Sequence, residues 1–143
     1  SIFLHSDLSH LFFNMFALFF FGTYLERMVG RRAFVTLFLL SGVIGNLGYA
    51  FTASSPFIPA IGASGAVYGI IGALAALTPF MLIFFFYMPV PMILAAIIWG
   101  FLDFAGLFSP SGVAHGAHLA GMFVGVIFGI YVRLKIKRQM SAI

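Results

Sequence analysis

The sequence predicts an all-α membrane protein, a polytopic bundle of transmembrane helices. Of its 143 residues, 63% are hydrophobic and only 7% are charged, whereas a water-soluble domain is about half apolar and one quarter charged. Seven basic and three acidic side chains could not solvate a soluble fold of this length. The basic residues form no basic face, which argues against a nucleic-acid partner, and the absence of cysteine excludes a disulfide-stapled domain. We therefore expect a lipid bilayer around the protein.

Five apolar blocks divide the chain, and a spanning helix needs about 20 apolar residues. We place these blocks at 8–26, 33–53, 62–82, 90–107 and 115–133. Only prolines separate the third block from the fourth, and prolines also occur inside transmembrane helices. One long tilted span followed by a re-entrant segment is therefore the alternative for this part of the chain.

The basic residues test the number of spans. All seven follow either the first or the fifth block: Arg27, Arg31, Arg32, Arg133, Lys135, Lys137 and Arg138. The positive-inside rule assigns both clusters to the cytoplasmic side, which requires an even number of crossings between them and favours five spans in all. The N-terminal stretch and the loops near 54–62 and 103–116 then face outward. The first block follows no basic start, so it does not have the form of a signal peptide.

Polar side chains inside spans are costly and are functional candidates by default. Five of them fall in the outer half of the expected bundle: His10, Asn14, Ser64, Tyr68 and His118. They come from three blocks but reach a similar depth, which favours one site over scattered polar contacts between helices. His10 and Asn14 share one helical face, and so do Ser64 and Tyr68, because both pairs are four residues apart.

Two stripes of small residues predict how this site is assembled. They recur every fourth residue and are Gly65, Gly69 and Ala73 in the third block and Ala117, Gly121, Gly125 and Gly129 in the fifth. Such stripes let helices pack closely. If they face each other, Ser64 and His118 meet at the outer end, and a serine beside a neutral histidine is a nucleophile with its general base.

Each signal also has an ordinary structural interpretation. A serine in a membrane helix usually bonds backbone, and glycine stripes are mainly packing devices. We expect His5 and His115 to be polar anchors near the surface, and Asp103 to be an interface residue at the end of the fourth block. Only the convergence of the five polar residues at one depth favours catalysis.

The sequence resembles the rhomboid intramembrane serine proteases. The resemblance covers almost the whole chain and is carried by three segments in family order: His10-Leu11-Phe12-Phe13-Asn14, Gly62-Ala63-Ser64-Gly65-Ala66 and Ala117-His118-Leu119-Ala120-Gly121. Gly125 continues the last segment, and Glu26 with Gly30 fits a further family pattern. Each motif alone is weak, but the three in order make a specific match.

The resemblance implies a Ser64–His118 dyad without a third carboxylate. The oxyanion hole would comprise His10, Asn14 and the backbone N–H of Ser64, with Tyr68 packed on the imidazole of His118 in place of an aspartate. Substrates of the family are single-span membrane proteins cut near the outer interface, so the active site is expected on the extracytoplasmic side of a cell membrane. No cofactor is implied, and the oligomeric state is left open.

Two departures from the family pattern stand out. Residues 1–143 are expected to form one rhomboid-like domain in which the first of six family spans is missing. Because the sequence begins with Ser and at a polar segment, we expect it to be a fragment or a processed chain. His115, three residues before His118, is often an amide in relatives.

Three other classes of function remain as alternatives. A catalytically silent relative that binds membrane-protein clients would be expected to lack Ser64 or His118. A metal or haem protein is disfavoured because there is no HExxH motif or cysteine, and because no outward carboxylate has ligand spacing to a histidine. A transporter usually has paired charges or repeat symmetry at mid-membrane, and neither is found.

Overall fold

Long apolar helices dominate the computed structural model, which describes residues 2–53, 57–85, 87–109 and 112–142. Within these residues, three helical segments are long and apolar enough to span a bilayer. The first joins α1 (Leu8–Ala17), the π-helical turn η1 (Leu18–Gly22) and α2 (Thr23–Val29), and the other two are α3 (Arg31–Thr52) and α6 (His115–Met140). The predicted bundle of membrane helices is confirmed.

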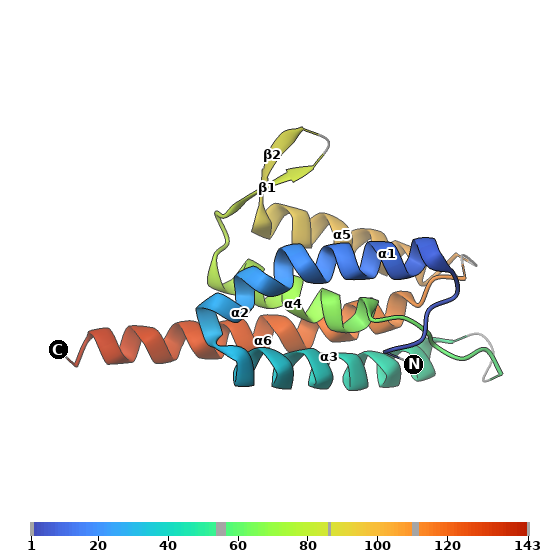
Figure 1. Cartoon of the computed structure of the whole chain (residues 1–143), viewed down its shortest axis with the longest axis horizontal. Helices are drawn as coiled ribbons and strands as arrows, with labels where there is room; N and C mark the ends of the chain where they lie inside the picture. The colour runs from blue at the N-terminus through green and yellow to red at the C-terminus, as the bar shows by residue number, and fades with distance from the viewer. Residues whose placement is uncertain (1, 54–56, 86, 110–111, 143) are drawn as a thin grey trace.

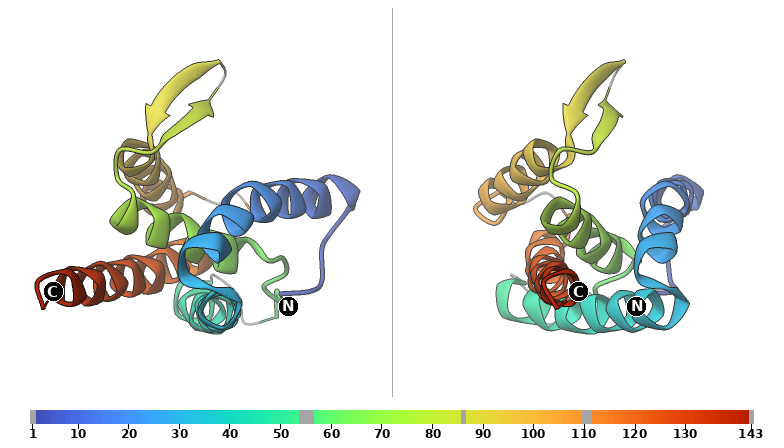
Figure 2. Two further views of the ribbon diagram at one scale, coloured as in Figure 1. Left: turned by 60° about the vertical axis from the view of Figure 1, so that its left-hand side comes forward. Right: turned by 90° about the vertical axis from the view of Figure 1, so that its left-hand side faces the viewer.

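Two shorter apolar helices, α4 (Ser64–Leu77) and α5 (Met92–Gly106), complete the bundle. At 1.5 Å per residue, the 14 residues of α4 extend about 21 Å, less than a hydrocarbon core of about 30 Å. Helix α4 can be short because it lies at the centre of the bundle, in contact with α1, α3, α5 and α6 (Figure 2). Its first residue, Ser64, is half-buried beside the neighbouring helices.

The boundary between the third and fourth blocks differs from the prediction. Helix α4 ends at Leu77 instead of residue 82, and a hairpin of β1 (Leu82–Phe85) and β2 (Met88–Pro91) precedes α5. Pro79 disfavours a helical conformation in the residue before it, which explains the end of α4. The alternative of a single tilted span was wrong, because α4 and α5 are separate helices, and the hairpin that follows α4 in the chain projects away from the bundle (Figure 1).

The small-residue stripes of α4 and α6 face each other. A side chain at Gly121 would collide with the carbonyl oxygen of Gly65, and one at Gly125 with that of Gly69. A Cβ at Gly129 would come within 2.6 Å of the Ala73 carbonyl oxygen. The two backbones are thus in direct contact over three helical turns, which brings the N-terminal ends of α4 and α6 together.

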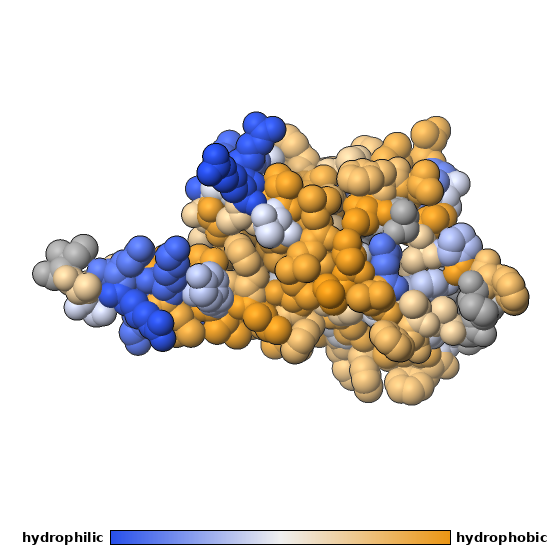
Figure 3. Space-filling model, turned by 90° about the horizontal axis from the view of Figure 1, so that it is seen from below, coloured by the Kyte–Doolittle hydropathy of each residue, from blue (hydrophilic) through white to orange (hydrophobic). Residues whose placement is uncertain are grey.

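The two ends of the bundle differ in charge. The arginines around the α2–α3 junction and the basic residues of the last turns of α6 are exposed and lie at one end (Figure 1). Apolar side chains cover the middle of the face in Figure 3, and hydrophilic ones cover its C-terminal end. This is the surface of an integral membrane protein, and α1, α4 and α6 all begin at the other end.

Candidate active site

The hydroxyl of Ser64 lies against the imidazole of His118. The distance from Ser64 Oγ to His118 Nε2 is 2.7 Å, although the two residues are 54 positions apart in the chain. Ser64 is the first residue of α4, and His118 lies in the first turn of α6 with only 9% of its surface exposed. The contact between the glycine stripes sets this distance, and the pair has the geometry of a nucleophile and its base.

Tyr68 lies one turn after Ser64 and packs flat on His118. The two ring centroids are 4.2 Å apart and the ring planes differ by only 10°. This contact blocks one face of the imidazole and restricts its rotation. Tyr68 thus makes the packing contact that the resemblance implies, and its role in catalysis stays a prediction.

Asp103 corrects the expectation that no carboxylate orients the histidine. Its Oδ1 atom lies 2.8 Å from His118 Nδ1. Only 4% of the surface of Asp103 is exposed, so that the residue is buried and does not lie at the membrane interface as expected. The end of α5 supplies this side chain. Sequence reasoning missed it because helical spacing does not relate residues on different helices, although an acid within an apolar block was itself a signal.

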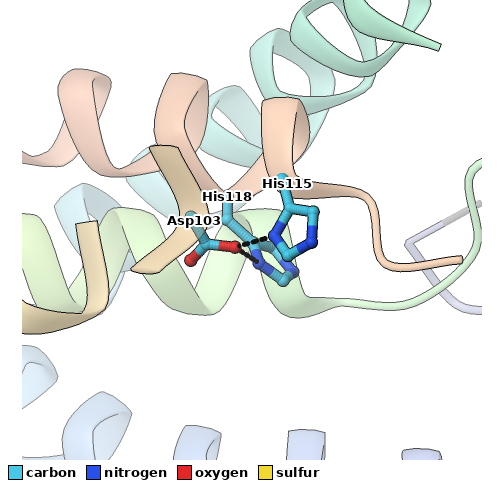
Figure 4. A group of neighbouring side chains, drawn as sticks. All are labelled: Asp103, His115 and His118. Carbon is cyan, nitrogen blue, oxygen red and sulfur yellow. Dashed lines mark hydrogen bonds and ion pairs between the residues drawn. The ribbon is translucent and has the colours of Figure 1, made fainter. Parts of the chain in front are cut away.

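His115 shares the carboxylate of Asp103 with His118. Its Nδ1 atom is 2.6 Å from the same Oδ1 atom, so that the oxygen lies between two imidazoles (Figure 4). His115 is therefore a partner of the buried acid as well as a residue near the surface.

The cluster also overturns the statement that no carboxylate has metal-ligand spacing to a histidine. Asp103, His115 and His118 each offer one ligand atom, all within 4.8 Å of one another. Tetrahedral zinc with bonds near 2.0–2.1 Å would hold its ligand atoms about 3.3–3.4 Å apart. The oxygen–nitrogen distances of 2.6 and 2.8 Å are shorter and fit hydrogen bonds better.

His10 lies against the loop that leads into α4. Gly62 has a φ of +109°, and a Cβ at this position would come within 2.6 Å of His10 Nε2. Glycine is therefore required at position 62 both for backbone conformation and for space. The other ring nitrogen, Nδ1, is 3.1 Å from Ser6 Oγ. His10 thus presents Nε2 to the loop that immediately precedes Ser64.

Asn14 is buried on the same face of α1, with 6% of its surface exposed. Its Nδ2 atom donates a hydrogen bond to the carbonyl of His10 at 2.9 Å. This bond occupies one of the two amide N–H groups and leaves the second for another acceptor. The backbone N–H of Ser64 is also without a partner inside α4, because Ser64 opens that helix.

The two expected polar anchors differ in their surroundings. The ring of His5 packs edge-on against His10 at 5.1 Å, and its buried Nε2 atom has no hydrogen-bond partner among the described residues. His115 borders a cavity of about 340 Å³ between the end of α3, the end of α5 and the start of α6. The carboxylate cluster is thus close to a cavity at the end of the bundle opposite the basic residues.

Comparisons with known proteins agree with these motifs. A family model described as the rhomboid domain matches residues 1–135. Rhomboid protein 1, mitochondrial, of Saccharomyces cerevisiae is 34% identical over 97% of this chain and 42% of its own length. The rhomboid protease GluP of Bacillus subtilis is 44% identical over 51% of the chain and 14% of its own length. The inactive RHOMBOID-like protein 8 of Arabidopsis thaliana is 38% identical over 50% and 20%. The chain thus spans less than half the length of these relatives.

Proposed function

Because the chain belongs to the rhomboid family, we propose that it is an intramembrane serine endopeptidase with Ser64 as nucleophile and His118 as general base. The observation that carries this proposal is the 2.7 Å contact between Ser64 Oγ and His118 Nε2. Both groups lie at the outer end of a bundle with an apolar surface, where a protease could meet a membrane-embedded substrate. The substrate class is a membrane protein with a single span.

The proposed reaction is acyl transfer in two steps. Ser64 Oγ attacks the scissile carbonyl carbon while its proton passes to His118 Nε2, and His118 then protonates the leaving amine. Water hydrolyses the acyl-enzyme with the same histidine as base. Because Ser64 and His118 are already within hydrogen-bond distance, the first proton transfer needs no rearrangement of the helices.

The proposed oxyanion hole combines the backbone N–H of Ser64 with the side chains of His10 and Asn14. The helix N-terminus at Ser64 supplies a donor and a positive dipole end. The contact between His10 and Gly62 supports placing the imidazole beside the same loop. Loss of one such donor typically costs about 2.7–4 kcal/mol of transition-state stabilisation.

The chain is proposed to be a multi-pass protein of the cell membrane, with its active site on the extracytoplasmic side. The exposed basic clusters at the opposite end of the bundle support this orientation. A substrate span must unwind before its peptide bond can reach Ser64, because helical backbone groups are hydrogen-bonded within the segment. Helix-weakening residues near the cleavage site are therefore part of the proposed specificity.

Cleavage of a single-span reporter protein in proteoliposomes tests the proposal. We expect the chain to cut the reporter near its outer interface, and Ser64→Ala and His118→Ala to abolish cleavage. Ser109→Ala, which changes an exposed serine outside the site, is the matched control and should keep full activity. A folded chain that cuts no reporter would indicate a silent relative, such as the inactive one named above. Cleavage that survives in Ser64→Ala would reject the assigned nucleophile.

A further inference from the structure

We propose that Asp103 is a positioning residue that holds neutral His118 in the tautomer with its proton on Nδ1, which leaves Nε2 free to act as base. We also propose that His115 holds the Asp103 carboxylate in place. The inference rests on the proposed protease function and goes beyond a Ser–His dyad. It would make Ser64, His118 and Asp103 a triad built from three different helices, with a second histidine supporting the acid.

The hydrogen-bond geometry determines which nitrogen of His118 carries the proton. An ionised carboxylate only accepts hydrogen bonds. The contact of 2.8 Å between Asp103 Oδ1 and His118 Nδ1 therefore requires a proton on Nδ1. In a neutral imidazole, Nε2 is then unprotonated and able to accept the proton of the Ser64 hydroxyl at 2.7 Å. Without the carboxylate, both tautomers become accessible, and one of them cannot act as base.

The surroundings of Asp103 fix the carboxylate itself. The same Oδ1 atom accepts hydrogen bonds from His115 Nδ1 at 2.6 Å and from His118 Nδ1 at 2.8 Å. Both donors come from α6, whereas Asp103 belongs to α5. The acid is only 4% exposed, so that water does not compete effectively for it. A buried carboxylate with two imidazole donors is held in place and keeps its negative charge directed at His118.

The same arrangement favours the charged state formed during the reaction. When His118 takes the proton of Ser64, its imidazolium is positive and lies beside the Asp103 carboxylate. Opposite charges at this distance attract strongly where water is excluded. Asp103 thus acts through His118 and touches no substrate atom.

Steady-state cleavage kinetics of the single-span reporter, with EDTA present to exclude metal effects, provide the first test. We expect Asp103→Asn to lower kcat about 100-fold with KM within threefold, since the loss concerns the base and not substrate binding. Asp103→Glu keeps the charge and should retain more activity than the amide. Glu26→Gln removes a carboxylate at the opposite end of the bundle and is the matched control. A kcat within threefold of the unaltered chain in Asp103→Asn would overturn the proposal.

A double-mutant cycle tests the part of His115. We expect His115→Ala to lower kcat less than Asp103→Asn does, and to have no further effect in the Asp103→Asn background. If the reductions in kcat caused by the two substitutions multiplied in the double variant, His115 would not act through Asp103.

Nitrogen-15 NMR of the histidine side chains reads the tautomer without any turnover. The chain has only four histidines, so that His118 can be assigned by substitution. The expected spectrum has a protonated Nδ1 and a bare Nε2 on His118, with mixed tautomers in Asp103→Asn. Protonation of Nε2 in the unaltered chain would refute the inference. If the chain cleaved no reporter, the protease proposal would fail, and this spectrum would still decide the role of Asp103.

Discussion

Gly62 connects two parts of the site through a single backbone position. Its φ of +109° is a conformation that side-chain-bearing residues rarely adopt, and the imidazole of His10 occupies the space where a Cβ would lie. Ser64 lies two residues further along the chain, so that any shift at Gly62 moves both the proposed nucleophile and a proposed oxyanion donor. The geometry proposed for catalysis therefore depends on glycine, which has no side chain, at position 62.

Gly62→Ala is expected to lower kcat about 100-fold, the size of effect that follows loss of one oxyanion-hole donor. Reporter cleavage in proteoliposomes measures it. Gly112→Ala is the matched control, because Gly112 also has a positive φ, +71°, but has open space around it. If both variants lost activity equally, backbone strain rather than displacement of His10 would be responsible.

The residues differ in how far the sequence could predict them. The small-residue stripes of the third and fifth blocks were sufficient to predict that Ser64 and His118 meet. The i, i+4 spacing of Ser64 and Tyr68 placed Tyr68 on the same helical face. Asp103 was not predictable in this way, because its contact depends on how α5 is rotated against α6. That rotation is set by side-chain packing between helices and leaves no periodic signal in the sequence.

Helix α1 begins with a capped turn that also carries His10. Asp7 is its N-cap, and Asp7 Oδ1 accepts the backbone N–H of His10 at 2.8 Å. The Ser6 hydroxyl and the His10 backbone N–H hold the pKa of Asp7 below its ordinary value. A lowered pKa in the folded state means that ionised Asp7 stabilises the protein above the unfolded-state pKa, and that this contribution is lost as pH falls through the folded-state pKa.

Asp7→Asn keeps a capping side chain but removes this titration. We expect the difference in thermal midpoint between the unaltered chain and the variant to be constant near neutral pH and to shrink below about pH 4, near the ordinary pKa of aspartate. Circular dichroism in detergent from pH 7 to pH 3 provides the measurement. Parallel curves for the two proteins over this range would contradict the assignment.

The contact between α4 and α6 depends on the absence of side chains. Gly125→Ala would push a methyl group into the Gly69 carbonyl oxygen and separate the two helices. Overpacking of this kind costs about 1–3 kcal/mol of unfolding free energy, and the separation should also reduce cleavage. Unfolding of the purified protein by a denaturing detergent measures the stability.

Gly100→Ala on α5 is the control for Gly125→Ala. The nearest atom to a Cβ at Gly100 is Met122 Sδ at 3.5 Å, an ordinary contact, so that stability should stay unchanged or rise slightly. Equal destabilisation of the two variants would argue against the close contact between α4 and α6.

Element boundaries were least predictable where the chain lacks charge. The first, second and fifth blocks could be placed because arginines and lysines mark their ends. Between Leu77 and Met92, an apolar stretch without charge looks the same as a helix or as a hairpin, and only Pro79, Pro89 and Pro91 break it. Lipid accepts apolar side chains on either structure, so that hydrophobicity alone could not distinguish them.

The whole molecule is a helix bundle with basic residues at one end and the candidate site at the other. The basic end is the one that we propose to face the cytoplasm, and the other end gathers the first residues of α1, α4 and α6 with the last turn of α5. A short central helix places Ser64, half-buried, at the N-terminal end of α4. The fold thus encloses a polar site within a largely apolar protein.

The proposed orientation predicts which end of the bundle faces outward. Because the chain has no cysteine, Ser109→Cys and Ser141→Cys each introduce a single reactive thiol, at exposed positions on opposite ends. In intact bacterial cells, a membrane-impermeant maleimide should label Ser109→Cys, and should label Ser141→Cys only after the membrane is opened. The reverse pattern would place the site on the cytoplasmic side.

Mass spectrometry of the chain after reaction with a fluorophosphonate in detergent shows whether His118 activates the Ser64 hydroxyl. A single adduct on Ser64, absent from folded His118→Ala, would show that this hydroxyl is activated by this imidazole. An adduct on another residue, or one on Ser64 that forms equally fast without His118, would show that Ser64 and His118 do not form the proposed nucleophile and base.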